Sequence, residues 1–255
     1  MYELFLTAPV RKDDFEMACA ILQGLTCMQA RQNVYRTLYY AGQPQPRGLP
    51  NQRTFRQSGQ ALPLWKELSN HLKRSSYVLQ LAYEVFPESD FGSGATVDLN
   101  GMPGTLRWTD LPDPLRDTPV TQRKKIDIPD QRNLLTTMSD NGHTFKNELI
   151  HETFSYVRTN VEFVFSRTYQ LPESPGRPTT ALPAWSDLRP VDPAQKWILN
   201  VKLTVEEENQ PEKLQKANKE LMAVKEELDR LFEFKVVDRR VLDTRIAPPQ
   251  VLPPR

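Results

Sequence analysis

The sequence predicts an α+β fold, namely a predominantly antiparallel β-barrel of about eight strands with flanking helices. Three observations lead to this prediction. Segments rich in β-branched and aromatic residues recur along the chain, several of them alternate apolar and polar side chains, and they lack the strand–helix–strand rhythm of a parallel sheet. About eight antiparallel strands of this length close into a barrel that is wide enough for side chains or a narrow tunnel.

The first half of the chain combines three expected strands with two expected helices. Residues 2–7 are apolar and β-prone, and residues 77–86 alternate apolar and polar side chains with a period of two. A third strand is expected at 34–40, which is rich in aromatic and β-branched residues. Apolar residues three and four positions apart predict amphipathic helices over 13–25 and 63–72.

The rest of the chain contains two expected helices and five further strands. Residues 130–141 have apolar residues at helical spacing and end at Asn141-Gly142, a suitable C-terminal cap. Residues 211–231 carry a heptad-type apolar seam, which we interpret as packing against a sheet within this fold. Strands are expected at 105–108, 121–128, 144–157, 160–170 and 197–205, with a hairpin turn at Thr159-Asn160 and a short strand or ordered end at 234–237.

Three segments without periodicity predict loops. Their Pro, Gly and polar residues indicate irregular and mobile backbone at 43–60, 87–104 and 171–195. The prolines of the third segment exclude a continuous helix or a central strand. The length permits one large domain, so we expect a single β-barrel domain over 1–247 and a proline-rich tail over 248–255.

Composition excludes some classes of protein. The chain of 255 residues has 33 Lys and Arg against 32 Asp and Glu, and this neutral balance disfavours a protein that binds nucleic acid through bulk charge. No apolar run approaches the length of a membrane-spanning helix, so we expect no membrane contact. No secretory signal precedes Cys19 and Cys27, and these two cysteines are expected to be ordinary thiols.

Motifs for common enzyme chemistry are missing from the sequence. It contains no P-loop, no dinucleotide-binding glycine pattern and no nucleophile-elbow serine. His71, His143 and His151 lack a nearby second ligand at metal-binding spacing. We therefore expect no catalytic residue, no cofactor and no metal site.

One group of residues still fits a metal-dependent phosphohydrolase. Carboxylates that alternate on strands and point into a barrel can hold a divalent metal and a triphosphate, as in tunnel-type triphosphatases. That family needs two alternating glutamates and a basic residue on the first strand, and here the first strand offers only Glu3, so the expected metal site is incomplete. The other members of the group are Lys202, Thr204, Glu206, Glu208 and Glu162.

A nucleic-acid-binding protein is the second alternative. Two short basic clusters, Arg123-Lys124-Lys125 and Arg239-Arg240, carry the positive charge that such a protein needs. Nearby aspartates dilute both clusters, which favours solvated surface over a nucleic-acid site. We therefore expect no direct nucleic-acid contact.

Several short motifs, in their order and spacing along nearly the whole chain, resemble the fungal Mediator subunit 18 family. None of them is catalytic. They are Tyr2-Glu3-Leu4-Phe5-Leu6-Thr7, Leu22-Gln23-Gly24-Leu25, Val34 to Tyr40 with Ala41-Gly42, Gln80-Leu81-Ala82-Tyr83-Glu84, Leu106 to Pro114, and the strand after Gln195.

The resemblance implies a non-catalytic nuclear subunit in the head module of the Mediator coactivator, which connects gene regulators with RNA polymerase II through protein–protein contacts. Members of the family form a β-barrel with flanking helices. They pair with Mediator subunit 20 and hold the C-terminal helix of Mediator subunit 8. Other head-module subunits and the polymerase would be contacted indirectly.

Partner binding would depend on apolar and aromatic anchors, because central interface residues of this kind dominate affinity. The end of the strand at 105–108 and the irregular segment after it offer Trp108, Leu111 and Leu115. We expect these three residues to contact partners, although Trp108 fits a core position equally well.

Overall fold

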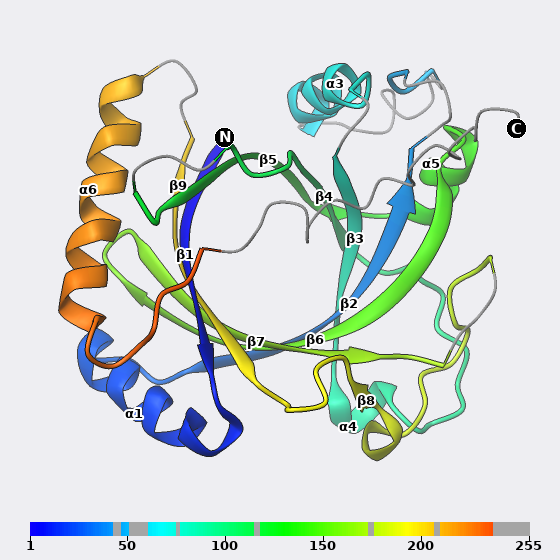
Figure 1. Cartoon of the computed structure of the whole chain (residues 1–255). Helices are drawn as coiled ribbons and strands as arrows, with labels where there is room; N and C mark the ends of the chain where they lie inside the picture. Colours follow the sequence, from blue (N-terminus) through cyan, green and yellow to red (C-terminus); the bar gives the residue numbers. More distant parts are fainter. Residues whose placement is uncertain are drawn as a thin grey trace, which may run out of the picture.

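Eight strands close into an antiparallel barrel. The computed structural model describes residues 1–42, 47–50, 61–74, 77–114, 118–172, 176–206 and 210–236. The strand order is β6-β2-β3-β4-β5-β1-β9-β7, and an additional pairing of β6 with β7 closes the ring (Figure 1). The bounds are β1 (Tyr2–Val10), β2 (Arg31–Ala41), β3 (Val78–Val85), β4 (Gly104–Thr109), β5 (Thr121–Gln131), β6 (Thr144–Arg158), β7 (Val161–Gln170), β8 (Arg189–Pro190) and β9 (Trp197–Val205).

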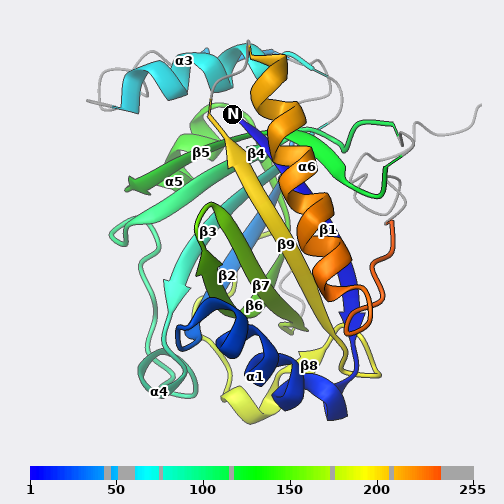
Figure 2. The ribbon, with the colours of Figure 1, turned by 90° about the vertical axis from the view of Figure 1, so that its left-hand side faces the viewer.

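Helices cover the outside of this barrel. Figure 2 shows α6 lying across β9 and β1, with α1 below it, and α3 lies against β5. None of the described helices is long and apolar enough to cross a membrane. The helical segments are α1 (Phe15–Thr26), α3 (Leu62–His71), α4 (Pro87–Asp90), α5 (Leu134–Asp140), α6 (Pro211–Leu228) and the 3-10 turns η1 (Lys12–Asp14) and η3 (Trp185–Asp187).

The expected strands and helices are confirmed with small shifts in their ends. The helix expected from residue 130 begins only at Leu134, because β5 continues to Gln131 and the left-handed Asn133 (φ 56°) precedes the helix. The last described residues, 232–236, are ordered but form no strand, and the Lys235 N–H donates to the Thr7 carbonyl at 2.8 Å.

The second and third expected loops contain some regular structure. Residues 87–104 include α4, and Phe91 forms an isolated bridge with Leu182, which lies in the third loop. The third loop, 171–195, also contains η3 and β8. Of the first loop only 47–50 are described, and the tail 248–255 lies outside the described residues. The mobility of these loops and the single-domain boundary stay predictions.

The apolar core lies between the barrel wall and its covering helices. One cluster joins the outward side chains of β1, including Leu4 and Leu6, to the inner faces of α1 and α6. The seam of α6 contributes Leu221 and Val224 to it, so the interpretation of that seam as packing within the fold is confirmed. A second cluster lies under α3 and α5, and a third lies under the segment that contains η3.

Pro9 is tolerated inside β1 because of the register of the neighbouring strands. β1 pairs with β9 over its whole length, but with β5 only from Tyr2 to Phe5. Thr7 turns its backbone towards the side that β5 has left, where its carbonyl accepts from Lys235. Residues two apart on a strand turn their backbone groups to the same side, so Pro9 removes a donor where no strand needs it.

Candidate functional site

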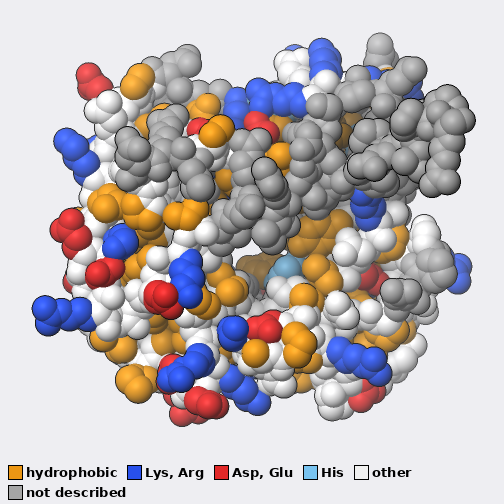
Figure 3. All heavy atoms as spheres, viewed as in Figure 1, with side chains coloured by type: hydrophobic (Ala, Val, Ile, Leu, Met, Phe, Trp, Pro, Cys, Tyr) orange, Lys and Arg blue, Asp and Glu red, His pale blue; other side chains and the backbone are white. Residues whose placement is uncertain are grey.

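The inside of the barrel is a polar lumen. Because successive strand residues face opposite sides and Leu4 and Leu6 point outward, Glu3 and its equivalents on other strands point inward. Figure 3 shows a hollow near the centre of the face seen in Figure 1, with a histidine side chain inside it. Charged side chains that face the lumen include Glu3, Arg107, Arg123, Lys125, Asp127, Glu162 and Lys202.

Glu3 is the centre of this charged group. Its Oε2 accepts a hydrogen bond from Arg123 Nε at 2.7 Å, and Lys125 Nζ lies 3.5 Å from its Oε1. Lys125 also lies 3.0 Å from Asp127, which accepts a bidentate pair from Arg107 at 2.8 and 3.0 Å. A series of ion pairs therefore connects β1, β5 and β4 across the inside of the barrel.

The cations determine the charge state of Glu3. Burial alone raises the pKa of a carboxyl group, but the positive charges of Arg123, Lys125 and Lys202 outweigh burial and lower the pKa of Glu3 to about 2. Asp127 follows the same pattern, because Arg107 and Lys125 lower its pKa in spite of burial. Both carboxylates are therefore ionised at neutral pH.

A second, uncharged group lies further along the lumen. The Tyr39 hydroxyl is 3.2 Å from His151 Nε2, and the Thr168 hydroxyl is 3.1 Å from His151 Nδ1. Burial, with a smaller effect of the Arg107 charge, lowers the pKa of His151 to about 4. Burial likewise raises the pKa of Tyr39 to about 12, so both side chains are neutral at pH 7.

The residues expected for a phosphohydrolase do not form a metal site in the part of the chain that is described. Glu162 faces Lys202 across the strand pair with 3.1 Å between the charged atoms, while Glu206 is exposed where β9 ends. Glu208 lies outside the described residues. Among those described, no three His, Cys, Asp or Glu side chains are placed to hold an ion. In the lumen, Glu3, Asp127 and Glu162 each lie beside a lysine or arginine instead.

The three residues of the basic cluster at 123–125 do not share one surface, because successive side chains of a strand point to opposite faces. Arg123 and Lys125 point into the lumen, whereas Lys124 points outward and lies 3.5 Å from Glu67 of α3. This cluster therefore presents no continuous basic face to a nucleic acid. Arg239 and Arg240 lie outside the described residues.

The three expected partner anchors differ in their positions. Trp108 is fully buried under α3, with its ring 4.7 Å from that of His71, so it is a core residue and does not reach a partner in this conformation. The physical reason is strand alternation, which turns Trp108 to the helix-covered side. Leu111 is half-buried after β4, and Leu115 lies outside the described residues.

Sequence reasoning missed a buried ion pair outside the lumen. Arg36 of β2 is fully buried and donates to Glu148 of β6 at 2.7 Å. The same guanidinium donates to the Thr179 carbonyl at 2.5 Å, and the Thr179 N–H donates to Glu148 at 2.7 Å. The pair therefore fixes the third loop to the barrel wall. The available signal was an arginine at an outward, otherwise apolar position between Val34 and Leu38.

Comparison with known proteins gives matches that span nearly the whole chain. The family model described as Med18 protein matches residues 2–245. The Mediator of RNA polymerase II transcription subunit 18 of Neosartorya fischeri is 24% identical over 96% of this chain and 99% of its own, and that of Aspergillus niger is 26% identical with the same coverage. The solved structure of the Schizosaccharomyces pombe Mediator head module contains a chain with a TM-score of 0.67 and 17% identity, covering 93% of this chain and 99% of that one.

Proposed function

Since the chain belongs to the Mediator subunit 18 family, we propose that it is a non-catalytic subunit of the head module of the Mediator coactivator. In this role it works in the nucleus and connects gene regulators with RNA polymerase II through protein–protein contacts. Its partners are Mediator subunit 20 and the C-terminal helix of Mediator subunit 8, and it meets other head-module subunits and the polymerase indirectly.

The observation that carries this proposal is the end-to-end match. The family model covers 2–245, and the named relatives are matched over 99% of their own length. The correspondence therefore concerns the entire named subunit and not a domain that occurs in many proteins. This matters because a shared fold alone does not imply a shared function.

The chemistry of the lumen supports a non-catalytic role. A metal-dependent hydrolase needs carboxylate oxygens that are available to the ion. Here Glu3, Asp127 and Glu162 each lie within 3.5 Å of a lysine or arginine of the barrel itself. These carboxylates are engaged in ion pairs that join strands, which is a structural use.

Co-purification tests the proposal. The chain is expressed alone and together with Mediator subunits 20 and 8 from the same source, and each sample is measured by size-exclusion chromatography with light scattering. We expect a stable complex with one copy of each protein. Separate elution at micromolar concentration, with this chain folded by circular dichroism, would contradict the assembly role.

Two assays test the alternatives. Release of phosphate from inorganic triphosphate in the presence of Mg²⁺ or Mn²⁺, lost in Glu206→Ala, would favour the triphosphatase. Binding of a DNA or RNA duplex with a steep dependence on salt would favour the nucleic-acid protein. We expect neither activity above the level of a buffer control.

A further inference from the structure

Strand β1 has one edge that its neighbour covers only in part. β9 pairs with β1 along its whole length, whereas β5 pairs with it only as far as Phe5. Beyond this point Thr7 and Pro9 turn their backbone groups to the side that β5 has left. Proline has no N–H group to donate. Within the described strand β1, Thr7 is therefore the residue that still offers both a donor and an acceptor on this edge.

The segment that follows α6 lies on this edge. The helix ends in a turn, where the Phe232 N–H donates to the Leu228 carbonyl at 2.9 Å, and the chain then turns back beside β1. Figure 2 shows it on the side of β1 that faces away from β9. The Lys235 N–H donates to the carbonyl of Thr7, at 2.8 Å, so the segment binds the residue that the edge leaves available. We call residues 231–236 the strap.

The side chains of the strap alternate in exposure as those of a half-buried strand do. Phe232 is 5% exposed and Phe234 is half-buried against the core cluster under α6, whereas the residues between and beside them are exposed. The Phe232 ring centre lies 6.4 Å from that of Phe165 on β7 and 6.5 Å from that of Phe234. Val236 is 40% exposed, so the contact with the core ends there. Two aromatic anchors and the hydrogen bond to Thr7 therefore hold the strap in place.

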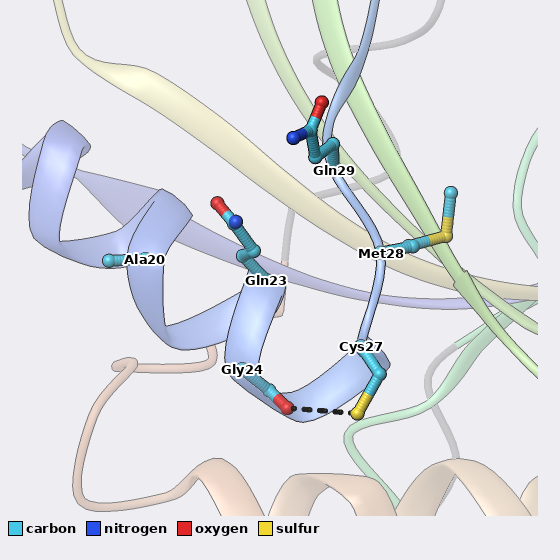
Figure 4. A pocket seen from close by; sticks show the side chains of 6 residues that line it. All are labelled: Ala20, Gln23, Gly24, Cys27, Met28 and Gln29. Atoms are coloured by element: carbon cyan, nitrogen blue, oxygen red, sulfur yellow. Dashed lines mark hydrogen bonds between the residues drawn. The ribbon is translucent and has the colours of Figure 1, made fainter.

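The chain leaves α1 in a different way. Between the last turns of that helix and the segment that leads to β2, a pocket of about 560 Å³ stays open (Figure 4). This opening exposes no free strand edge, because β2 pairs with β6 on one side and with β3 on the other. The segment after α6, in contrast, lies where a strand edge would otherwise face solvent.

An unpaired strand edge is a template for pairing with another chain. Every copy of this chain carries the same edge, so two copies can meet edge to edge about a two-fold axis. In an antiparallel pair centred on Thr7, the Thr7 N–H of each copy would donate to the Thr7 carbonyl of the other. The strap occupies this space and binds the same carbonyl, so the strap and a second copy exclude each other.

We propose that the strap keeps the isolated chain monomeric, and that a second copy adds to the edge of β1 when the strap is released. The helix that covers the outer face of β1 thus also delivers the segment that covers its edge. Pro9 supports this protection, because it removes a donor from the same edge. The inference goes beyond the proposed function, since it concerns the chain alone and needs none of its partners.

Three variants of the full chain test the strap. Lys235→Pro removes the N–H group that binds Thr7, and Phe232→Ala removes an anchor. Lys235→Ala is the matched control, because it keeps the N–H group and shortens only an exposed side chain. Hydrogen exchange followed by mass spectrometry measures the release of 231–236. Size-exclusion chromatography with light scattering measures the mass over a range of protein concentrations.

We expect exchange in the strap to become about tenfold faster or more in Lys235→Pro and Phe232→Ala, with the circular dichroism spectrum retained. The mass of both variants should rise with concentration from that of one chain to that of two. Wild type and Lys235→Ala should keep a protected strap and the mass of one chain. Because Lys235 is exposed, Lys235→Pro keeps the test valid even if Phe232→Ala fails to fold.

A rescue variant locates the contact. Thr7→Pro removes the remaining donor of the edge, on the side away from β9, so the pairing of β1 with β9 should persist as it does at Pro9. Added to Lys235→Pro, it should restore the monomer. A dimer that survives this change would place the contact elsewhere and overturn the inference.

Two further results would also overturn it. Folded variants whose strap exchanges rapidly but which stay monomeric would show that the edge does not attract a second copy. Unchanged exchange in the strap of both variants would show that neither the hydrogen bond nor the anchor holds it. Neither result would affect the proposed function, which co-purification with the partner subunits tests separately.

Discussion

Glu3 and Arg123 form an ion pair inside the barrel, with 2.7 Å between Arg123 Nε and Glu3 Oε2, and thereby join β1 to β5. The backbone pairing of these two strands covers only Tyr2 to Phe5, so this side-chain contact strengthens the shortest seam in the barrel apart from that of β8. Arg123 also lies 5.0 Å from the centre of the Phe5 ring, which shields the pair on one side.

Replacing Glu3 by Gln should destabilise the protein by about 3 kcal/mol, because it takes from half-buried Arg123 its buried counter-charge and leaves buried Lys125 with Asp127 alone. Urea unfolding followed by circular dichroism measures this change. Glu206→Gln is the control, since Glu206 is exposed and its loss should change the free energy of unfolding by less than about 0.5 kcal/mol. Equal effects of the two changes would show that the lumen pair contributes nothing.

The same pair should make stability depend on pH. The pKa of Glu3 is about 2 in the folded protein against an ordinary value of 4.5, so its contribution is complete above pH 4.5 and is lost as the pH falls towards 2. The difference in unfolding free energy between wild type and Glu3→Gln should therefore shrink over this range. Urea titrations at a series of pH values measure it, and a constant difference down to pH 2 would contradict the assignment.

Removal of Arg36 should release the third loop from the barrel wall. Arg36→Ala leaves Glu148 buried without its cation and the Thr179 carbonyl without its donor, so we expect a loss of about 3 to 5 kcal/mol. Hydrogen exchange followed by mass spectrometry should show faster exchange at 176–190. The pairing of β1 with β9 lies elsewhere in the barrel and serves as the internal control, because its exchange should change much less.

Trp108 and Leu111 should respond differently to substitution. Trp108→Ala removes a fully buried ring from the cluster under α3 and should cost about 3 to 5 kcal/mol of stability. Leu111→Asp changes a half-buried residue and should keep the circular dichroism spectrum while weakening the complex with Mediator subunits 20 and 8. Unfolding of Leu111→Asp would instead make Leu111 structural.

The local periodicity of the sequence predicts most elements but does not predict where their polar faces lie. The alternation at 77–86 correctly predicts a strand with one apolar face. The opposite face of such a strand normally meets solvent, whereas in a closed barrel it meets other strands. Glu3 is 4% exposed for this reason, and no local pattern distinguishes it from a surface glutamate.

Prediction of the candidate site from the sequence was limited for the same reason, since local patterns do not show which strands become neighbours. Sequence reasoning placed Glu162 and Lys202 on separate strands but could not pair them, because the pairing depends on the register of β7 against β9. The sequence did not decide whether Trp108 contacts a partner or packs in the core, because the helix that covers it, α3, is distant in the sequence. The boundary at Asn133 was missed because a left-handed residue there is set by the end of β5.

The pairing of β1 with β9 determines when the barrel can be completed during synthesis. Among the described strands β1 leaves the ribosome first and β9 last, so β1 waits with one edge unpaired until residues 197–205 have emerged. A chain that stops before Trp197 exposes the edges of β1 and β7 together with the apolar residues that α6 would cover. Such fragments should aggregate rather than persist as partial barrels.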